Sequence, residues 1–225
     1  AYCPTEGLTA TQACPVGYYC PSNTYFTGLS IEYNKIPCPV GTYNDLQSKA
    51  ALSDCKPCPA GKYCNAEALS SVPGDCAAGY FCATSSPFEK PAFTDGSGNY
   101  GLCPKGSHCA AATSTPTQCA LGEYSDMTKL VDNTYCKKCE PGHYCATQGI
   151  SAPTGKCDPG YYCTEGSSSK TQNDCPTKHY CPQGSPNPIE CENGFYNTVI
   201  KQAKCLACGA GSWCFNGDKS DCPKG

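Results

Sequence analysis

Arginine is absent from the 225-residue chain, so that all sixteen basic residues are lysines. Arg supplies the planar, bidentate contacts by which proteins hold phosphate groups, and a net charge of −3 gives no attraction to a polyanion. No apolar run approaches the roughly 18 residues that suggest a membrane-spanning helix. The composition therefore predicts no nucleic-acid partner and no membrane span.

Large apolar side chains are also scarce, because Val, Ile, Leu, Phe and Met together occupy 26 of 225 positions. This is below the roughly 20% expected of a chain that builds a packed core. Cys, by contrast, occupies 24 positions, above the roughly 8–10% that marks a disulfide scaffold. Closing a loop of about 15 residues contributes roughly 3 kcal/mol in the chain-entropy model, so a dozen bridges can replace a core. We predict a small disulfide-rich, extracellular protein.

A seven-residue motif, Cys-Pro-x-Gly-x-Tyr-Cys, organises the chain and is best seen at Cys58–Cys64. Glycine stands fourth because the chain must turn there and glycine accepts a positive φ without steric cost. The exception is Lys178, where we expect the turn to be made differently. Further copies, with changes, are Cys14–Cys20, Cys76–Cys82, Cys103–Cys109, Cys139–Cys145, Cys157–Cys163, Cys175–Cys181 and Cys208–Cys214.

The cysteines follow an eight-member pattern that is used three times after an initial Cys3. The first copy has Cys14, Cys20, Cys38, Cys55, Cys58, Cys64, Cys76 and Cys82; the second has Cys103, Cys109, Cys119, Cys136, Cys139, Cys145, Cys157 and Cys163; the third has Cys175, Cys181, Cys191, Cys205, Cys208, Cys214 and Cys222. Such a long period predicts an array of stacked repeats. We expect residues 1–13 to end a preceding module and repeats to occupy 14–102, 103–174 and, incompletely, 175–225.

The third cysteine of each copy starts a variant motif that lacks the second cysteine. The variants are Cys38-Pro-Val-Gly-Thr-Tyr, Cys119-Ala-Leu-Gly-Glu-Tyr and Cys191-Glu-Asn-Gly-Phe-Tyr. A polar stretch follows each variant and suits two short strands with a turn, as in residues 44–48. Helix is scarce, with one plausible turn at residues 46–52. The expected architecture is an elongated rod of tandem cysteine-rich modules with short β-hairpins and little helix.

Ser, Thr and Pro cluster at residues 84–87, 112–117 and 166–169. The simplest interpretation is surface loops, and the more specific one is O-glycosylation, because such segments are extended and accessible. The candidate acceptors are Thr113, Ser114, Thr115, Thr117, Ser167, Ser168 and Ser169. No Asn-x-Ser/Thr acceptor is present, so ordinary N-glycans are excluded.

Two features of the sequence could suggest a metal site. The Cys-x-x-Cys pairs that begin at Cys55, Cys136 and Cys205 are too few, and too far from a second pair, for a multi-zinc protein. Residues 94–99 alternate oxygen-bearing side chains as a calcium loop does, but Gly106 stands where a bidentate Glu is required. We therefore expect no metal and no cofactor.

Catalysis is not expected either, because no nucleophile, base and oxyanion donor can be assembled from these residues. His108, His143 and His179 are the candidates for a pH sensor or a ligand. Each lies in the motif at or beside a position that Tyr fills elsewhere. A packing or surface role is therefore predicted for all three.

The run Cys-Pro-x-Gly-x-Tyr, followed by Cys-x-x-Cys-Pro-x-Gly-x-Tyr-Cys, resembles the ephrin A/B receptor-like cysteine-rich repeats, which are relatives of tumour-necrosis-factor-receptor modules. The best matches are residues 38–64, 119–145 and 191–214. Long arrays of these repeats are similar to those in surface proteins of protists and algae, including the mastigoneme proteins of flagellar hairs. The resemblance implies a self-associating structural subunit of an extracellular fibre, or of a coat on a cell or flagellar surface. The alternative is a ligand-binding or adhesive ectodomain stalk, such as a surface antigen.

The resemblance also implies hairpin-closing bridges at Cys38–Cys55, Cys119–Cys136 and Cys191–Cys205. Crossed pairs of neighbouring motifs would follow, as Cys58–Cys76 with Cys64–Cys82 and Cys139–Cys157 with Cys145–Cys163. A rival set instead joins Cys64–Cys76 and Cys145–Cys157 and closes Cys55–Cys58. Spacing alone does not decide between them.

The ends of the chain read as two parts of one motif. Residues 222–225 are its first four positions and residues 1–3 its last three, so that tail and head together complete a copy. We expect the chain to be one period of a longer array, with copies joined head to tail. Gly225 of one copy would then lie beside Ala1 of the next, and Cys3 would bridge to a neighbour's cysteine.

Overall fold

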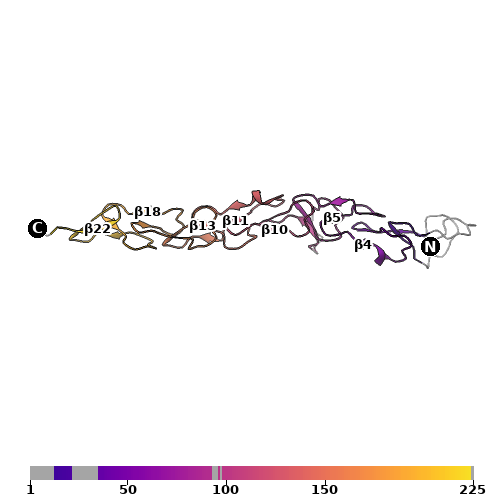
Figure 1. Ribbon diagram of the computed structural model, residues 1–225, viewed down its shortest axis with the longest axis horizontal. Helices are drawn as coiled ribbons and strands as arrows, with labels where there is room; N and C mark the ends of the chain where they lie inside the picture. Colours follow the sequence, from indigo (N-terminus) through magenta and orange to yellow (C-terminus); the bar gives the residue numbers. More distant parts are fainter. Residues whose placement is uncertain (1–12, 22–34, 93–95, 97, 224–225) are drawn as a thin grey trace, which may run out of the picture. The chain divides into compact units, whose positions relative to one another are not determined.

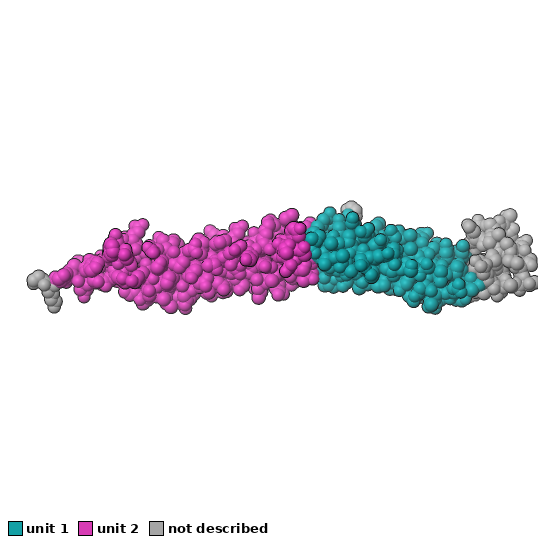
Figure 2. All heavy atoms as spheres, turned by 45° about the horizontal axis from the view of Figure 1, so that its top comes forward, with its two compact units in different colours: residues 1–103, 109–116, 129–131 teal, residues 104–108, 117–128, 132–225 magenta. Residues whose placement is uncertain are grey.

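The computed structural model describes residues 13–21, 35–92, 96 and 98–223. The chain divides into two compact units, an N-terminal unit of residues 1–103, 109–116 and 129–131 and a C-terminal unit of residues 104–108, 117–128 and 132–225 (Figure 2). The predictions made for the two chain ends and for Cys3 fall outside the described residues. So do three members of the calcium-like loop, residues 94, 95 and 97.

Within the described residues, each strand belongs to a two-stranded antiparallel hairpin, and Figure 1 labels one strand of several of them. The pairs are β1 (Tyr18–Tyr19) with β2 (Ile36–Pro37), β3 (Thr42–Tyr43) with β4 (Lys56–Pro57), β5 (Lys62–Tyr63) with β6 (Gly74–Asp75), β7 (Tyr80–Cys82) with β8 (Tyr100–Leu102), β9 (Ser107–His108) with β10 (Thr117–Gln118), β11 (Glu123–Tyr124) with β12 (Lys137–Lys138), β13 (His143–Tyr144) with β14 (Gly155–Lys156), β15 (Tyr161–Tyr162) with β16 (Asn173–Asp174), β17 (His179–Tyr180) with β18 (Ile189–Glu190), β19 (Phe195–Tyr196) with β20 (Leu206–Ala207), and β21 (Ser212–Phe215) with β22 (Asp218–Asp221).

Each hairpin follows from the motif in the same way. The first strand includes motif positions five and six, and the second lies just before the opening cysteine of the next motif. We call each such segment a hairpin module and count positions from its opening cysteine. Modules 1 to 11 open at Cys14, Cys38, Cys58, Cys76, Cys103, Cys119, Cys139, Cys157, Cys175, Cys191 and Cys208. The tandem, disulfide-rich hairpin fold predicted above is confirmed.

The polar stretches after the variant motifs form the hairpin loops, and the strands lie at their two ends. The prediction of a helical turn at residues 46–52 is wrong, because Ser48 has a φ of 60°, outside the helical region. A short 3₁₀ turn instead spans Leu52–Asp54 (η1), and its equivalent in the C-terminal unit spans Asn133–Tyr135 (η2).

Sulfur takes the place of an aliphatic core. Every buried hydrophobic residue in the described parts of the chain is a cysteine except Pro91, Tyr124 and Leu130. Tyr124 packs with Cys139 and Cys145, and Ile150 covers this cluster. The stability of the fold therefore depends on covalent closure and backbone hydrogen bonds. Among the described residues, no helix is long and apolar enough to cross a bilayer.

Candidate functional site

The disulfides show what each motif does. Eight bridges close a single motif on itself, from its first cysteine to its last: Cys14–Cys20, Cys58–Cys64, Cys76–Cys82, Cys103–Cys109, Cys139–Cys145, Cys157–Cys163, Cys175–Cys181 and Cys208–Cys214. Three longer bridges, Cys38–Cys55, Cys119–Cys136 and Cys191–Cys205, close the hairpins of modules 2, 6 and 10. In the described residues Cys222 alone is a free, exposed cysteine.

The three hairpin-closing bridges are therefore confirmed, whereas the crossed pairs and the rival set with Cys55–Cys58 are both wrong. The reason is local geometry. In module 3 the Lys62 N–H donates to the Pro59 carbonyl (3.1 Å) across a β-turn, and Gly61 supplies a φ of 77° at its third position. This turn brings the Cα atoms of Cys58 and Cys64 to 5.9 Å, within the usual range for a bridge.

Every bridge in the described residues thus lies inside one module, and none joins two modules. Disulfides at this density persist in oxidising compartments, which indicates an extracellular or secreted protein. Consecutive modules must then be held together without covalent cross-links.

Backbone hydrogen bonds make these junctions. Between modules 2 and 3, the Gly41 N–H donates to the Cys64 carbonyl (2.9 Å), and the Cys58 N–H donates to the Gly41 carbonyl (2.9 Å). The Ala68 N–H of the next loop donates to the Cys38 carbonyl (3.0 Å). Equivalent bonds recur along both compact units, so one junction geometry is used repeatedly.

The motif glycines also determine how closely a module approaches the module two places further along the chain. A Cβ atom built on Gly61 of module 3 would lie 2.3 Å from the carbonyl oxygen of Ala112 in module 5. One on Gly160 of module 8 would lie 2.5 Å from the Lys201 carbonyl oxygen in module 10. These distances are shorter than any tolerated contact, so a side chain at the fourth position would separate the modules. The glycine is therefore required for close approach as well as for the turn.

Lys178 is the exception at the fourth position, because it has a side chain where the other motifs have glycine. At this contact the glycine is in the partner module instead. The Lys178 φ of 66° lies in the same left-handed region as that of the motif glycines. The residue that meets it two modules later is Gly217, where a Cβ atom would lie 2.5 Å from the Lys178 Cβ. The Lys178 ammonium then reaches the Asp218 carboxylate at 2.6 Å. At this contact, as at the others, at least one partner lacks a side chain.

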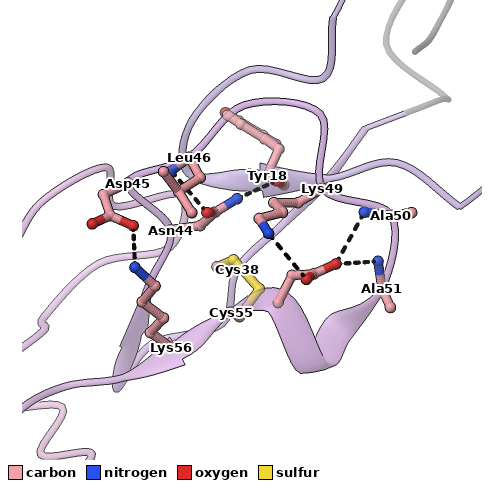
Figure 3. Close-up of polar contacts among 11 residues, drawn as sticks. Tyr18, Cys38, Asn44, Asp45, Leu46, Lys49, Ala50, Ala51, Cys55 and Lys56 are labelled. Atoms are coloured by element: carbon pink, nitrogen blue, oxygen red, sulfur yellow. Dashed lines mark hydrogen bonds and ion pairs between the residues drawn. A yellow bond between two sulfur atoms is a disulfide. The ribbon is translucent and has the colours of Figure 1, made fainter.

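Modules 2, 6 and 10 replace the second motif cysteine by a buried polar residue, Asn44, Ser125 or Asn197, each no more than 1% exposed. The Asn44 amide donates to the Tyr18 carbonyl of module 1 (2.8 Å), and its Oδ1 accepts from the Leu46 N–H (3.0 Å; Figure 3). Sequence reasoning missed this role. The available signal was a short polar residue at position seven of all three variants.

Equivalent ion pairs lie within modules 2 and 6. The Lys56 ammonium lies 2.6 Å from the Asp45 carboxylate (Figure 3), and Lys137 lies 2.7 Å from Asp126. Lys56 also lies 5.8 Å from the ring centre of Tyr43. The hydrogen bond from the lysine lowers the pKa of each of the two carboxyl groups and raises the pKa of the lysine. Both pairs are exposed to solvent, so they neutralise the surface more than they stabilise the fold.

The three histidines lie in separate hairpins, at β9, β13 and β17, and each is partly buried. His179 makes a 2.8 Å contact through Nδ1 with the Thr177 carbonyl, and its strand partner is Glu190. The described ranges contain no group of three or more His, Cys, Asp or Glu side chains arranged to hold a metal ion. The structure thus brings none of the candidate ligands together.

The candidate glycosylation sites differ in access. Thr115 and Thr117 are exposed, whereas Thr113, Ser114, Ser168 and Ser169 are partly buried. Ser167 is 3% exposed, its hydroxyl donates to the Thr164 carbonyl (2.8 Å), and its own carbonyl accepts from the Cys145 N–H. Its hydroxyl is therefore closed to a transferase in the folded protein.

A scan against protein-family models gives no match for this chain, and a search of curated proteins gives none either.

Proposed function

We propose that this protein is a structural subunit of an extracellular fibre or cell-surface coat, a mastigoneme-like filament whose copies associate head to tail. The observation that carries the proposal is the repeated junction. Each module binds its successor with one set of backbone groups and its predecessor with the complementary set. A contact of this kind is heterologous and does not close on itself, so it propagates as a linear array.

The covalent pattern supports the same function. Because each bridge closes one module, each module has its own covalent closure in place of an aliphatic core. The resemblance of the motif to receptor-like repeats in algal and protist surface proteins points the same way. O-glycans on exposed threonines would keep such a polymer hydrated, since its net charge is only −3.

The test is assembly of the purified, oxidised chain. Electron microscopy of negatively stained protein and sedimentation velocity over a concentration series should show filaments with a regular axial repeat. The matched control is the same chain after reduction and alkylation, which should not assemble. An oxidised chain that stays monomeric at all concentrations would contradict the proposal and favour the adhesive-stalk alternative.

A further inference from the structure

The hairpin of module 11, β21–β22, is the longest in the described residues. Each of its strands has four residues, whereas every other described strand has two or three. The loop is Asn216-Gly217, and its φ values of 49° and 76° are those of the tight type I′ turn that joins two strands directly. All four residues of β22 are exposed. This strand therefore offers more backbone to solvent than the second strand of any other described hairpin.

The tight turn fixes which backbone groups of β22 face β21. Phe215 pairs with Asp218 across the loop, and further along the hairpin the Cys222 N–H donates to the Gly211 carbonyl (2.9 Å). In an antiparallel pair, alternate residues direct their N–H and carbonyl groups to opposite sides of the strand. The backbone groups of the even-numbered residues in β22 therefore face β21, and those of the odd-numbered residues point away from it.

The outward-pointing backbone groups belong to Lys219 and Asp221. In the described residues, neither makes a backbone hydrogen bond outside its own hairpin. The junctions between modules do not cover this edge, because they use the opening cysteine, the fourth and seventh motif positions and the hairpin loop. An unpaired edge of this kind is a template for a further strand, which binds by backbone hydrogen bonds.

The two outward positions carry opposite charges. Lys219 and Asp221 are two residues apart, so their side chains lie on the same face of the strand. The Lys219 ammonium lies 5.2 Å from the ring centre of Tyr196, and Asp221 accepts a 3.4 Å hydrogen bond from the Ser212 hydroxyl. Neither forms an ion pair with another described residue. A strand that pairs with this edge is therefore favoured if it offers an acid opposite Lys219 and a base opposite Asp221.

A second copy of the chain supplies both charges through its own β22. When two β22 strands pair antiparallel about a twofold axis at Ser220, Lys219 of each copy lies opposite Asp221 of the other. The backbone groups of these two residues point outward, so the hydrogen bonds and both charge pairs form in the same register. A shift of two residues would place two lysines or two aspartates opposite one another. A shift of one residue would place outward-pointing backbone groups opposite inward-pointing ones.

The second strands of the other described hairpins lack this combination. β2 and β4 contain Pro37 and Pro57, which have no N–H to donate to a new strand. β12 consists of Lys137 and Lys138, which would repel a second copy of the same strand. No second strand other than β22 has both a basic and an acidic residue. The edge of module 11 is therefore the one suited to pair with itself among the described hairpins.

Pairing would also extend an aromatic face. Trp213 lies opposite Ser220 on the face of the hairpin away from Cys214, and Phe215 is on the same face as Trp213. Trp213 and Phe215 are 52% and 51% exposed. In the paired sheet the two Ser220 residues meet at the axis, and one Trp213 lies on the outer side of each. Serine is small, so the indole rings can cover the axis and lose contact with water.

We propose that the β22 edge is a self-complementary docking site, by which module 11 pairs with module 11 of a second copy of the chain. The product is a four-stranded sheet, β21–β22–β22–β21, with a twofold axis at Ser220. This contact is isologous and closes with two copies, so it goes beyond the head-to-tail association proposed above and does not depend on it. Within a fibre or coat, it would connect two arrays at module 11.

The first test exchanges the charges at the edge, in full oxidised chains that all carry Cys222→Ser to remove the free thiol. Lys219→Asp and Asp221→Lys each place like charges opposite one another twice, so each should weaken self-pairing about 30-fold. An equimolar mixture of the two variants should pair as strongly as the parent chain, because every acid then faces a base. The matched control is Glu190→Lys, which reverses a charge on β18 whose side chain is 88% exposed.

Pairing is measured by sedimentation equilibrium over a concentration series. The emission of Trp213, the single tryptophan, should shift to shorter wavelength as the copies pair. Ser220→Cys adds a geometric test, because residues that face each other in a non-hydrogen-bonded pair have Cα atoms about 4.5 Å apart, within the usual range for a disulfide. Ser220→Cys should therefore form a covalent dimer on air oxidation, and Glu190→Cys should not. Non-reducing peptide mapping verifies the native bridges in each variant.

The contact is overturned if the parent chain stays monomeric at every concentration, if either charge variant pairs with itself as the parent does, or if the mixture fails to restore pairing. It is equally overturned if Ser220→Cys and Glu190→Cys cross-link to the same extent. Pairs without filaments would support this contact and contradict the head-to-tail proposal. Filaments of equal mass per length in the parent chain and in Lys219→Asp would do the reverse.

Discussion

Gly217→Ala tests the rule that one partner in each contact between every second module must lack a side chain. The added Cβ atom would lie 2.5 Å from the Lys178 Cβ and 2.7 Å from its carbonyl oxygen. Overpacking of this kind costs roughly 1–3 kcal/mol, and a φ of 76° adds about 1–2 kcal/mol for a residue with a Cβ. We expect Gly217→Ala to destabilise the hairpin of module 11 by about 2–5 kcal/mol.

Two further variants separate these contributions. Gly211→Ala has a similar φ of 83° but no atom within 4 Å of the added Cβ, so it should show the backbone cost alone. Lys178→Gly removes the Cβ atom nearest to the new methyl group, but the Cα atom and the carbonyl oxygen at position 178 stay 2.6 and 2.7 Å from it. Combined with Gly217→Ala, it should therefore recover only part of the overpacking cost, about 1 kcal/mol, despite the loss of the Lys178–Asp218 pair, whose exposed position makes it weak.

The assay is urea unfolding of the oxidised protein followed by tryptophan fluorescence. The single tryptophan of the chain, Trp213, lies in β21 and reports on the affected hairpin directly. The reasoning is refuted if Gly217→Ala is no more destabilising than Gly211→Ala. It is equally refuted if Lys178→Gly gives no recovery in the double variant.

The other predictions concern the bridges, the ion pairs and the glycans. Non-reducing peptide mapping should return one bridge inside each of the eight motifs that have two cysteines. Peptides cross-linked between two motifs would contradict the structure. The Lys137 hydrogen bond lowers the pKa of Asp126 in the folded chain, so its contribution to stability is complete above the usual Asp pKa of about 4 and is lost as the pH falls through the lowered value. Asp126→Asn should therefore flatten the acid limb of melting temperature against pH, and an unchanged limb would count against the pair. Glycopeptide mass spectrometry should find O-glycans at Thr115 or Thr117, and occupancy confined to Ser167 would be inconsistent with its burial.

Much of the architecture could be predicted from the sequence. A chain with 24 cysteines and few aliphatic residues has no alternative to a disulfide scaffold, and glycine at a fixed place in each motif predicts a turn there. The motif spacing also located the modules, because the first strand of each hairpin begins at position five, a constant distance from its opening cysteine. The three hairpin-closing bridges followed from a resemblance to receptor-like repeats.

Only the tertiary structure decided the remaining bridges and the contacts between modules. Cysteine spacing restricts the pairing but does not choose it, since the choice depends on how closely a turn returns the chain. The left-handed glycine turn brings Cys58 back to Cys64, which makes the crossed pairs unnecessary. Why Lys178 is tolerated was equally hidden, because its partner Gly217 is 39 residues away in sequence and meets it through the stacking of modules. The residues of one motif determine how that motif closes on itself. A contact between a module and the one two places further along the chain exists only after the modules have stacked.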